Sequence, residues 1–379
     1  MAMDRLFLLM KEKGASDMFV AVNSPIHLKI NGTLIPVNQQ RLDQANVMAL
    51  LAEVVSAEQL RQLERDNELN IGIPVAGVGS FRLSAFRQRG SVSAVLRYIP
   101  VTIPPLEDLG LPPVLSELIR QKRGLLLVVG ATGSGKSTTI AAMLNHRNQQ
   151  MPGHILTLED PIEFLFRNQR SIVNQREIGT DSASLATALK NALRQAPDCI
   201  LIGEIRDQET MSAALAYAQS GHLVVSTLHA NNTYRALNRI INFYPLENRP
   251  ALLQDLASTI CGIVSQRLIP ATGGGRVAAV EIMLNTQHVA ELIEQGDIGA
   301  IKEAIEKSMA PGSQTFEQAL LQLIRDGRVT SEEALAHADS ATNLYWLLNN
   351  EPSGKKSAPP PEPEPAEGGA TFTEFTLNL

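Results

Sequence analysis

A run of consecutive residues has the types and the spacing of a phosphate-binding loop. It consists of Gly130, Ala131, Thr132, Gly133, Ser134, Gly135, Lys136 and Ser137, followed by Thr138. Glycines let backbone N–H groups close around phosphates, the lysine reaches the β- and γ-phosphates, and the serine hydroxyl offers an oxygen to Mg2+. A chance glycine-rich turn is the alternative, but the apolar run 125–129 and the helical pattern 138–148 flank the loop as the mechanism requires. The loop therefore predicts a site for a nucleoside triphosphate and Mg2+.

Carboxylates follow two other short apolar runs. The run 199–203 is followed by Glu204, and the run 154–158 is followed by Glu159, Asp160 and Glu163. A phosphate-binding loop needs an acid at the end of a neighbouring strand to hold Mg2+ and to position water. A solvated strand end explains any single acid, but two strands that both end in acids favour a catalytic role.

Histidines and arginines give weaker signals. His222 and His229 flank the run 223–228, where an odd separation places them on opposite faces of a strand, and spacing alone favours ordinary surface histidines. Four arginines cluster earlier in the chain. A solvated sheet face and delivery of a cation to a neighbouring subunit's γ-phosphate explain this cluster equally well. The four are Arg82, Arg87, Arg89 and Arg97.

The elements that must position these residues fall into two patterns. Apolar runs at 125–130, 154–160, 199–204 and 223–228 alternate with helical stretches, as in a mostly parallel sheet covered on both faces. Upstream, a tight turn at Asn31-Gly32, a helical pattern at 45–63 and an alternating stretch at 70–98 predict a small α+β unit with an antiparallel meander.

Composition shifts set the expected domain boundaries. Five prolines in 100–113 predict a linker, and six prolines in 351–379 predict a disordered tail. We expect an N-terminal domain at 1–99, a linker at 100–115, and an ATP-binding α/β domain at 116–350 that becomes helical after residue 285.

The overall composition narrows the function classes. A net charge of −6 gives no bulk electrostatic case for binding nucleic acid, which we do not expect as a partner. The two cysteines, Cys199 and Cys261, lie in apolar runs and predict reduced core thiols. No signal peptide or membrane-length apolar run is evident, so a cytoplasmic protein is expected.

Five ordered segments resemble the motor ATPases of secretion and pilus systems. They read GATGSGKST, ILTLEDPIEF, LRQAPDCILIGEIRDQET, SGHLVVSTLHA and IVSQRLIP. Across roughly residues 1–345 the set is similar to the PilT/PilU family of type IV pilus retraction ATPases. The resemblance implies a homohexameric ring, a PAS-like N-terminal domain and a RecA-like ATPase domain that binds ATP and Mg2+.

The resemblance also implies roles for particular residues. Glu163 and Glu204 become the catalytic carboxylates, with the choice of general base left open. His229 becomes a γ-phosphate sensor with His222 beside it, and Arg82 and Arg97 match arginines presented across the subunit interface. The implied metal-side residues are Ser137, Glu159, Asp160 and Glu204.

One segment departs from the retraction family. Retraction ATPases typically carry a helix of the form AIRNLIR, whereas residues 288–294 read HVAELIE, and the two arginine positions are assigned here to Val289 and Glu294. Together with the proline-rich tail, this departure resembles the PilU branch. We therefore expect an accessory retraction motor, with a PilT-type ATPase and the inner-membrane pilus platform protein as partners.

Other functions remain in competition. An assembly ATPase of a pilus or a type II secretion system is the nearest, although that branch usually carries a four-cysteine zinc site that two cysteines cannot build. A DNA motor and a binding-only pseudoenzyme are less well supported. The apolar end of the tail predicts a docking segment or an end without a partner, and its apolar residues are Phe372, Phe375, Leu377 and Leu379.

Overall fold

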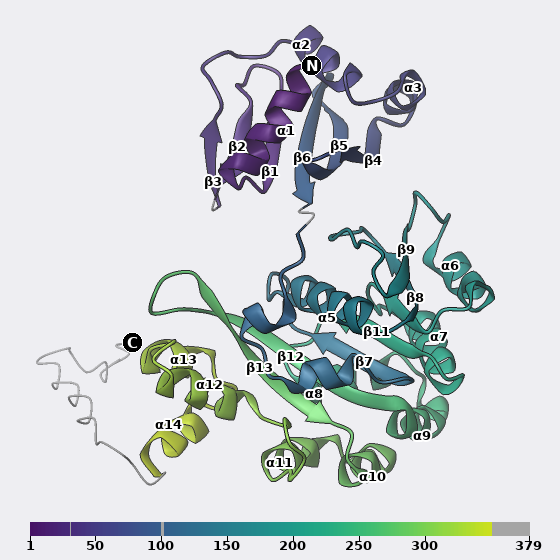
Figure 1. The fold of residues 1–379 in the computed structure, drawn as a ribbon, viewed down its shortest axis with the longest axis vertical. Helices are drawn as coiled ribbons and strands as arrows, with labels where there is room; N and C mark the ends of the chain where they lie inside the picture. The colour runs from purple at the N-terminus through teal and green to yellow at the C-terminus, as the bar shows by residue number, and fades with distance from the viewer. Residues whose placement is uncertain (31, 100–101, 351–379) are drawn as a thin grey trace, which may run out of the picture.

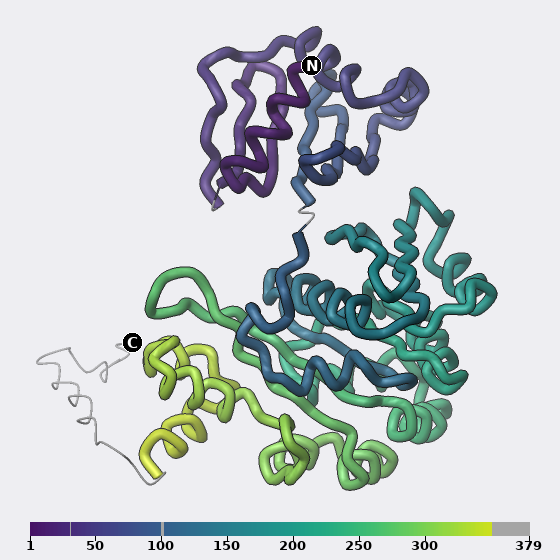
Figure 2. The backbone as a smooth tube through the Cα atoms, in the orientation of Figure 1, coloured from purple at the N-terminus to yellow at the C-terminus, as the bar shows by residue number. Residues whose placement is uncertain are grey.

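The computed structural model describes residues 1–30, 32–99 and 102–350, which contain two β-sheets (Figure 1). One sheet is built from strands between residues 17 and 99, and the other from strands between 124 and 284. Figure 2 traces the same division along the backbone: the first unit runs from purple to blue, and the second from blue through teal and green to yellow. The predicted tail 351–379 lies outside the described residues.

The first sheet is antiparallel, with the strand order β3-β2-β1-β6-β5-β4. The predicted meander is confirmed as three strands, and the predicted helical stretch at 45–63 forms two helices with a break between them. Ser56 ends the break between them, because its side chain caps the second helix by accepting from the backbone N–H of Gln59. The elements are α1 (Ala2–Lys13), β1 (Asp17–Val20), β2 (His27–Ile30), β3 (Thr33–Pro36), α2 (Gln44–Ala52), α3 (Ala57–Asp66), β4 (Glu68–Val75), β5 (Gly79–Gln88) and β6 (Ser91–Ile99).

Within the described residues, helices pack against one face of this sheet (Figure 1). Phe81 and Leu83 of β5 are fully buried, and Phe7 of α1 stacks on Phe81 with ring centroids 4.1 Å apart. Residues between them along β5 lie on the other face, as the period of two in a strand requires. Arg82 and Arg97 are therefore on the face away from the core.

The second sheet has the order β13-β12-β7-β11-β10-β8-β9, and every neighbouring pair is parallel except β12–β13. Helices cover both of its faces. All six residues of β7 are buried, which explains why its sequence is a continuous apolar run without alternation. The strands are β7 (Gly124–Val129), β8 (Gly153–Glu159), β9 (Ser171–Glu177), β10 (Cys199–Ile202), β11 (Leu223–Leu228), β12 (Ile260–Pro270) and β13 (Arg276–Leu284).

The two faces have separate apolar cores. Helices α4 (Val114–Leu118) and α5 (Lys136–Gln150) cover one face. Six helices cover the other. They are α6 (Leu185–Ala192), α7 (Gln208–Gln219), α8 (Thr233–Asn242), α9 (Arg249–Thr259), α10 (Gln287–Gln295) and α11 (Ile301–Glu306). The short 3-10 turn η2 (Leu193–Gln195) follows α6, η3 (Leu246–Asn248) joins α8 to α9, and η4 (Ile298–Ala300) joins α10 to α11.

A third apolar core forms at the far end of the β12–β13 hairpin. Ile269 and Val277 of the hairpin contact Phe316 and Leu344 from the C-terminal helices. This core explains why the helical pattern after residue 285 folds back onto the sheet. The helices are α12 (Phe316–Arg325), α13 (Ser331–His337) and α14 (Ala341–Asn350).

Part of the predicted linker at 100–115 is packed rather than free. The 3-10 helix η1 (Leu106–Leu109) and α4 bury Leu106 and Leu115 in the core beside α5. Among the described residues, the stretch from Leu106 onward therefore belongs to the second sheet's unit, because two apolar side chains anchor it despite its prolines.

The assignment of a lost arginine to Val289 is wrong. Val289 is 2% exposed and packs in the apolar core with Leu292 and Ile293 of α10, so no exposed cation fits there. When AIRNLIR is aligned residue by residue with positions 288–294, its first arginine falls on Ala290 and its second on Glu294, which is exposed. These two positions are four residues apart and share one face of the helix.

Two simpler expectations concern cysteines and membranes. Cys199 is buried and unpaired, and burial raises the pKa of its thiol to about 11, so it is an unreactive core thiol. Among residues 1–30, 32–99 and 102–350, no helix combines the length and the apolarity needed to span a bilayer.

Candidate active site

The phosphate-binding loop joins β7 to α5, as its sequence predicts. Gly133 and Gly135 have φ values of 78° and 89°, which favour glycine. The Nζ of Lys136 donates to the carbonyl oxygens of Gly130 and Ala131 over 2.9 and 3.0 Å. Burial lowers the pKa of Lys136, while the charges of Glu204 and Glu163 oppose this shift. The lysine ammonium thus lies across the loop, where a phosphate would be bound.

A cavity of about 480 Å³ opens beside this loop. It is lined by residues that follow β7, β8, β10 and β11, which are mutually parallel, so their carboxyl ends meet at one edge of the sheet. The cavity brings together Thr132, Gly133, Lys136, Ser137, Glu159, Asp160, Glu163, Glu204 and His229 of the predicted site.

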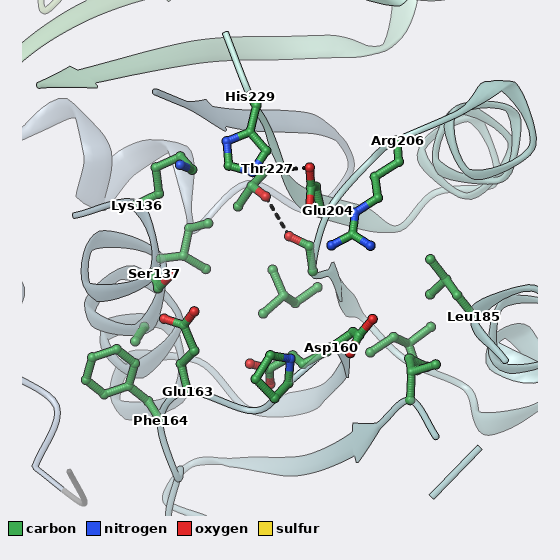
Figure 3. A pocket seen from close by; sticks show the side chains of 18 of the residues that line it. Lys136, Ser137, Asp160, Glu163, Phe164, Leu185, Glu204, Arg206, Thr227 and His229 are labelled. Carbon is green, nitrogen blue, oxygen red and sulfur yellow. Dashed lines mark hydrogen bonds and ion pairs between the residues drawn. The ribbon is translucent and has the colours of Figure 1, made fainter. Parts of the chain in front are cut away.

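Both carboxylate oxygens of Glu204 have close side-chain neighbours. One of its oxygens, Oε2, accepts a hydrogen bond from the Nε of Arg206 over 2.7 Å, and the other lies 3.3 Å from the Nε2 of His229. Figure 3 shows these three side chains on the side of the cavity away from Glu163. Both Glu204 oxygens therefore have cationic or imidazole neighbours that fix their direction.

Glu163 lies on the other side of the cavity. Its carboxylate points toward Ser137 at the start of α5 (Figure 3). Glu159, at the end of β8, is buried, and its carboxylate accepts from the Oγ1 of Thr157 over 2.6 Å and from the Nε2 of Gln175 over 3.3 Å. Burial raises the pKa of Glu159, and the backbone N–H of Glu163 also contacts its carboxylate. Glu159 thus supports the segment that carries Glu163.

The oxygen atoms around the cavity are compatible with Mg2+. Ser137, Asp160, Glu163 and Glu204 all line it. In the described part of the chain no cluster of three or more His, Cys, Asp or Glu side chains suited to a metal ion occurs. Mg2+ in nucleotide sites usually has one or two protein ligands, with waters and phosphates completing its shell. The residues present fit such a site, in which Mg2+ would neutralise charge on the phosphates.

Three predicted site residues lie away from both the phosphate-binding loop and this cavity. His222 precedes β11 and so lies at the amino edge of the sheet, opposite the phosphate-binding loop, where its Nδ1 is 3.1 Å from the carbonyl oxygen of Tyr217. Because β11 separates the two histidines, His222 does not lie beside His229. Arg82 and Arg97 belong to the first sheet, where they are direct cross-strand partners.

One arginine of this pair forms an ion pair with an acid on the neighbouring strand β1. The Nε of Arg97 donates to Asp17 over 2.9 Å, and Asp17 is also the cross-strand partner of Arg97 on β1. Like charges directly opposite one another on a sheet are unfavourable. Arg82, Arg97 and Asp17 together carry one net positive charge, which suits binding of an anion.

Arg206 was missed by sequence reasoning. It lies two residues after Glu204 and lines the same cavity, and its contact with Glu204 raises its own pKa. The position of an arginine directly after an acid-ended strand was the available signal. Thr227 was also missed; its Oγ1 donates to the carbonyl oxygen of Gly203 over 2.7 Å and ties β11 to the loop of Glu204.

A second cavity of about 400 Å³ lies on the other side of the phosphate-binding loop. It is lined by loop residues Ala131 and Ser134 and by cationic side chains of the β12–β13 region and α13. Those cationic or ionisable residues are Arg267, Arg276 and His337. The loop thus has open space on both sides of its phosphate-binding backbone.

The fold and this site define a P-loop ATPase. A family model described as Type II/IV secretion system protein matches residues 3–336. The chain is 46% identical to the type IV pilus ATPase PilU of Pseudomonas aeruginosa over 92% of this chain and 91% of that protein. It is 37% identical to the type IV pilus retraction ATPase PilT of the same organism over 91% of this chain and 100% of that protein.

A solved structure agrees with these sequence matches. The crystal structure of the pilus retraction motor PilT with bound ADP has a TM-score of 0.84 and 39% identity to this chain, covering 90% of this chain and 98% of that one. The chain therefore belongs to the PilT/PilU family of type IV pilus ATPases, within the type II/IV secretion ATPases.

Proposed function

We propose that this protein is a hexameric ATPase motor for retraction of type IV pili and twitching motility, which works together with a PilT-type ATPase. The observation that carries the proposal is the 46% identity to a pilus ATPase over nearly the full length of both chains, with the phosphate-binding loop and both acids in one cavity. We place its work at the cytoplasmic face of the inner membrane, on the pilus platform protein.

The site supports a division of tasks in ATP hydrolysis. The loop 130–137 binds the phosphates, Lys136 neutralises charge on the β- and γ-phosphates, and Ser137 binds Mg2+. Glu163 and Glu204 face the cavity from two sides. This arrangement suits one of them to activate the attacking water and the other to hold Mg2+. His229, in contact with Glu204, senses whether the γ-phosphate is present.

Neighbouring subunits complete this site in the proposed ring. Arg82 and Arg97 lie on an open sheet face with surplus positive charge, away from their own chain's cavity. Arginines supplied from another subunit stabilise charge on a γ-phosphate during hydrolysis. His222, which lies at the other edge of its own sheet, is proposed to contact nucleotide only across the same interface.

The helix α10 supports an accessory role. Ala290 and Glu294 occupy the positions of the two family arginines on one face, so a cationic surface is replaced by a neutral and an anionic residue. A reversed charge makes contact with an acidic partner unfavourable instead of only weaker. The ring then adds force or processivity to a PilT-type ring rather than pulling alone.

The test uses cells with fluorescent pili whose PilT-type protein is present but has a dead phosphate-binding loop. We expect retraction to continue there, to stop when this chain carries Lys136→Ala, and to be absent when the PilT-type protein is deleted. Retraction in that deletion strain would refute the accessory role. Retraction that never depends on this chain would refute the motor function.

A sharper variant combines Ala290→Arg with Glu294→Arg. If the reversed charge on α10 prevents independent work, this double variant should gain retraction in the deletion strain. His288→Arg is the matched control, because His288 is exposed on the same helix but lies about 160° around it from Ala290 and about 120° from Glu294.

An assembly ATPase is the second candidate. It predicts that cells lacking this chain have few or no pili, whereas the retraction proposal predicts normal or increased pilus numbers. The two cysteines of the whole sequence argue against it, since they cannot form the four-cysteine zinc site usual in that branch.

A further inference from the structure

A side chain from β12 contacts the underside of the phosphate-binding loop. The Nε2 of Gln266 donates to the carbonyl oxygen of Ser134 over 2.9 Å, and its Oε1 accepts from the Oγ1 of Thr139 over 2.8 Å. Gln266 is 3% exposed and Thr139 is 1% exposed. One buried amide therefore joins the loop to the first turn of α5.

The register of the sheet brings Gln266 to this place. In the parallel pair of β12 and β7, Ser265 lies beside Val129, so Gln266 follows beside Gly130. The backbones approach closely: a Cβ on Gly130 would be 2.5 Å from the carbonyl oxygen of Gln266, and one on Gly135 would be 2.8 Å from its Nε2. Two glycines of the loop are thus needed for contact with Gln266 as well as for their backbone angles.

The contact with Ser134 decides how one peptide group is oriented. The carbonyl of Ser134 and the N–H of Gly135 belong to one planar trans peptide, so they point in opposite directions. When the carbonyl is held toward β12, the Gly135 N–H is directed away from β12. Backbone N–H groups of such loops are the donors that bind phosphate oxygens.

We propose that Gln266 is a positioning residue for ATP, which locks the Ser134–Gly135 peptide so that the Gly135 N–H faces the phosphates. The inference rests on the proposed function of the loop 130–137 as the phosphate site. The loop holds phosphates before and during hydrolysis, so a lost orientation weakens substrate and transition-state binding alike. Such a loss raises KM more than it lowers kcat.

The main test is the Gln266→Glu variant, which removes the donor to Ser134 but keeps the acceptor for Thr139 and the side-chain size. We expect the KM for ATP and the dissociation constant of ADP, measured by calorimetry, to rise about tenfold, equivalent to about 1.4 kcal/mol. The value of kcat should change by less than about threefold.

A pH profile separates positioning from a general structural role. Burial raises the pKa of a carboxyl group, and a protonated carboxyl can donate to the Ser134 carbonyl again. The KM of the Gln266→Glu variant, relative to wild type, should therefore fall toward unity between about pH 9 and about pH 6. Gln266→Met, which carries no charge and neither contact, should keep a raised relative KM throughout.

Gln314→Glu is the matched control. The Nε2 of Gln314 donates to the carbonyl oxygen of Val280 over 2.8 Å, and Val280 is the cross-strand partner of Gln266. The same chemical change is thus made beside the same strand pair without touching the loop, and KM should stay at the wild-type value.

Three outcomes overturn the role of Gln266: wild-type KM and ADP affinity in both Gln266 variants, a raised KM in Gln314→Glu, or a relative KM of Gln266→Glu that does not change with pH. Lys136→Ala separates this failure from failure of the phosphate site. If Lys136→Ala loses nucleotide affinity while both Gln266 variants behave as wild type, only the inference fails. If Lys136→Ala binds ADP as tightly as wild type, the loop itself is not the site.

Discussion

The two sheets of this protein use their faces differently. Along β5 of the antiparallel sheet, buried Phe81 and Leu83 alternate with residues of the open face, among them Arg82. Along β7 of the parallel sheet every side chain is buried between two layers of helices. The first sheet therefore has a face on which charged side chains can lie, whereas the central strand β7 of the second sheet has no such face.

This difference determines where chemistry can occur. In the parallel sheet, polar side chains gather in the loops at the carboxyl edge, where Lys136, Glu163 and Glu204 share a cavity. In the antiparallel sheet, Arg82 and Arg97 are presented along the strands themselves. The pocket is thus formed at the carboxyl edge of the parallel sheet within one chain, whereas side chains on the open face of the antiparallel sheet are available for contact with a neighbouring chain.

The largest effect is expected at the carboxyl edge. Lys136→Ala should abolish Mg2+-dependent ATP hydrolysis, measured by phosphate release, because the cation at the phosphates is lost. Lys190→Ala is the control, since Lys190 is exposed on α6 and lies outside the cavity. Hydrolysis at the wild-type rate in Lys136→Ala would break the assignment of the edge as the site.

Neutralising either carboxylate should lower turnover at least tenfold, which corresponds to a loss of about 1.4 kcal/mol of transition-state stabilisation. Glu204→Gln and Glu163→Gln keep the side-chain size and remove the charge. The variant on the metal side should also need more Mg2+ for half-maximal rate, whereas loss of the general base should leave the Mg2+ requirement unchanged. Wild-type turnover in both variants would remove the assignment of the acids.

The open face should produce a smaller effect that acts between subunits. Subunits with both Arg97→Ala and Lys136→Ala, mixed into wild-type rings, should lower ATP hydrolysis below rings mixed with Lys136→Ala alone, because the neighbour loses a cation at its γ-phosphate. The same is expected for Arg82→Ala.

Asp17→Asn is the control for that mixing experiment. It breaks the ion pair with Arg97 and keeps the arginine, so it reports any loss of folding. If rings mixed with the arginine variants hydrolyse ATP at the same rate as rings mixed with Lys136→Ala alone, these arginines belong only to a solvated sheet face.

The smallest effect concerns Glu281, a carboxylate buried in the covered sheet. It is 3% exposed, and its Oε1 accepts from the backbone N–H of Thr233 over 2.7 Å. Burial raises its pKa in the folded protein. The folded state then holds the proton to higher pH than the unfolded state, so this group makes stability fall as pH rises from the unfolded pKa through the folded pKa.

In mild acid, the Tm of Glu281→Gln should therefore equal that of wild type or lie below it. At neutral or alkaline pH, the Tm of the variant should exceed that of wild type by a few degrees. Glu294→Gln is the control, because Glu294 is exposed and its neutralisation should give a difference in Tm that varies little with pH. A Tm difference for Glu281→Gln that is independent of pH would mean that burial does not penalise this carboxylate.

Sequence reasoning predicted the local features of the fold and site. The phosphate-binding loop, the acids after two strands and the covered parallel sheet follow from the order of residues along short segments, where covalent spacing and strand or helix period determine what is adjacent. The break at Ser56 between α2 and α3 was missed, although its capping box was a readable signal. The packing of Leu106 was missed because prolines suggest a linker whatever their apolar neighbours contact.

The sequence by itself therefore determined the class of chemistry: a loop for phosphates, acids beside it and arginines on an alternating strand. Only the tertiary structure decided which distant side chains meet. His229 reaches Glu204 from the next strand of the sheet, Gln266 reaches Ser134 across 132 positions of sequence, and His222 is left at the far edge. Such contacts depend on strand order and register, which arise from burying apolar faces over the whole domain, and no local spacing carries that information.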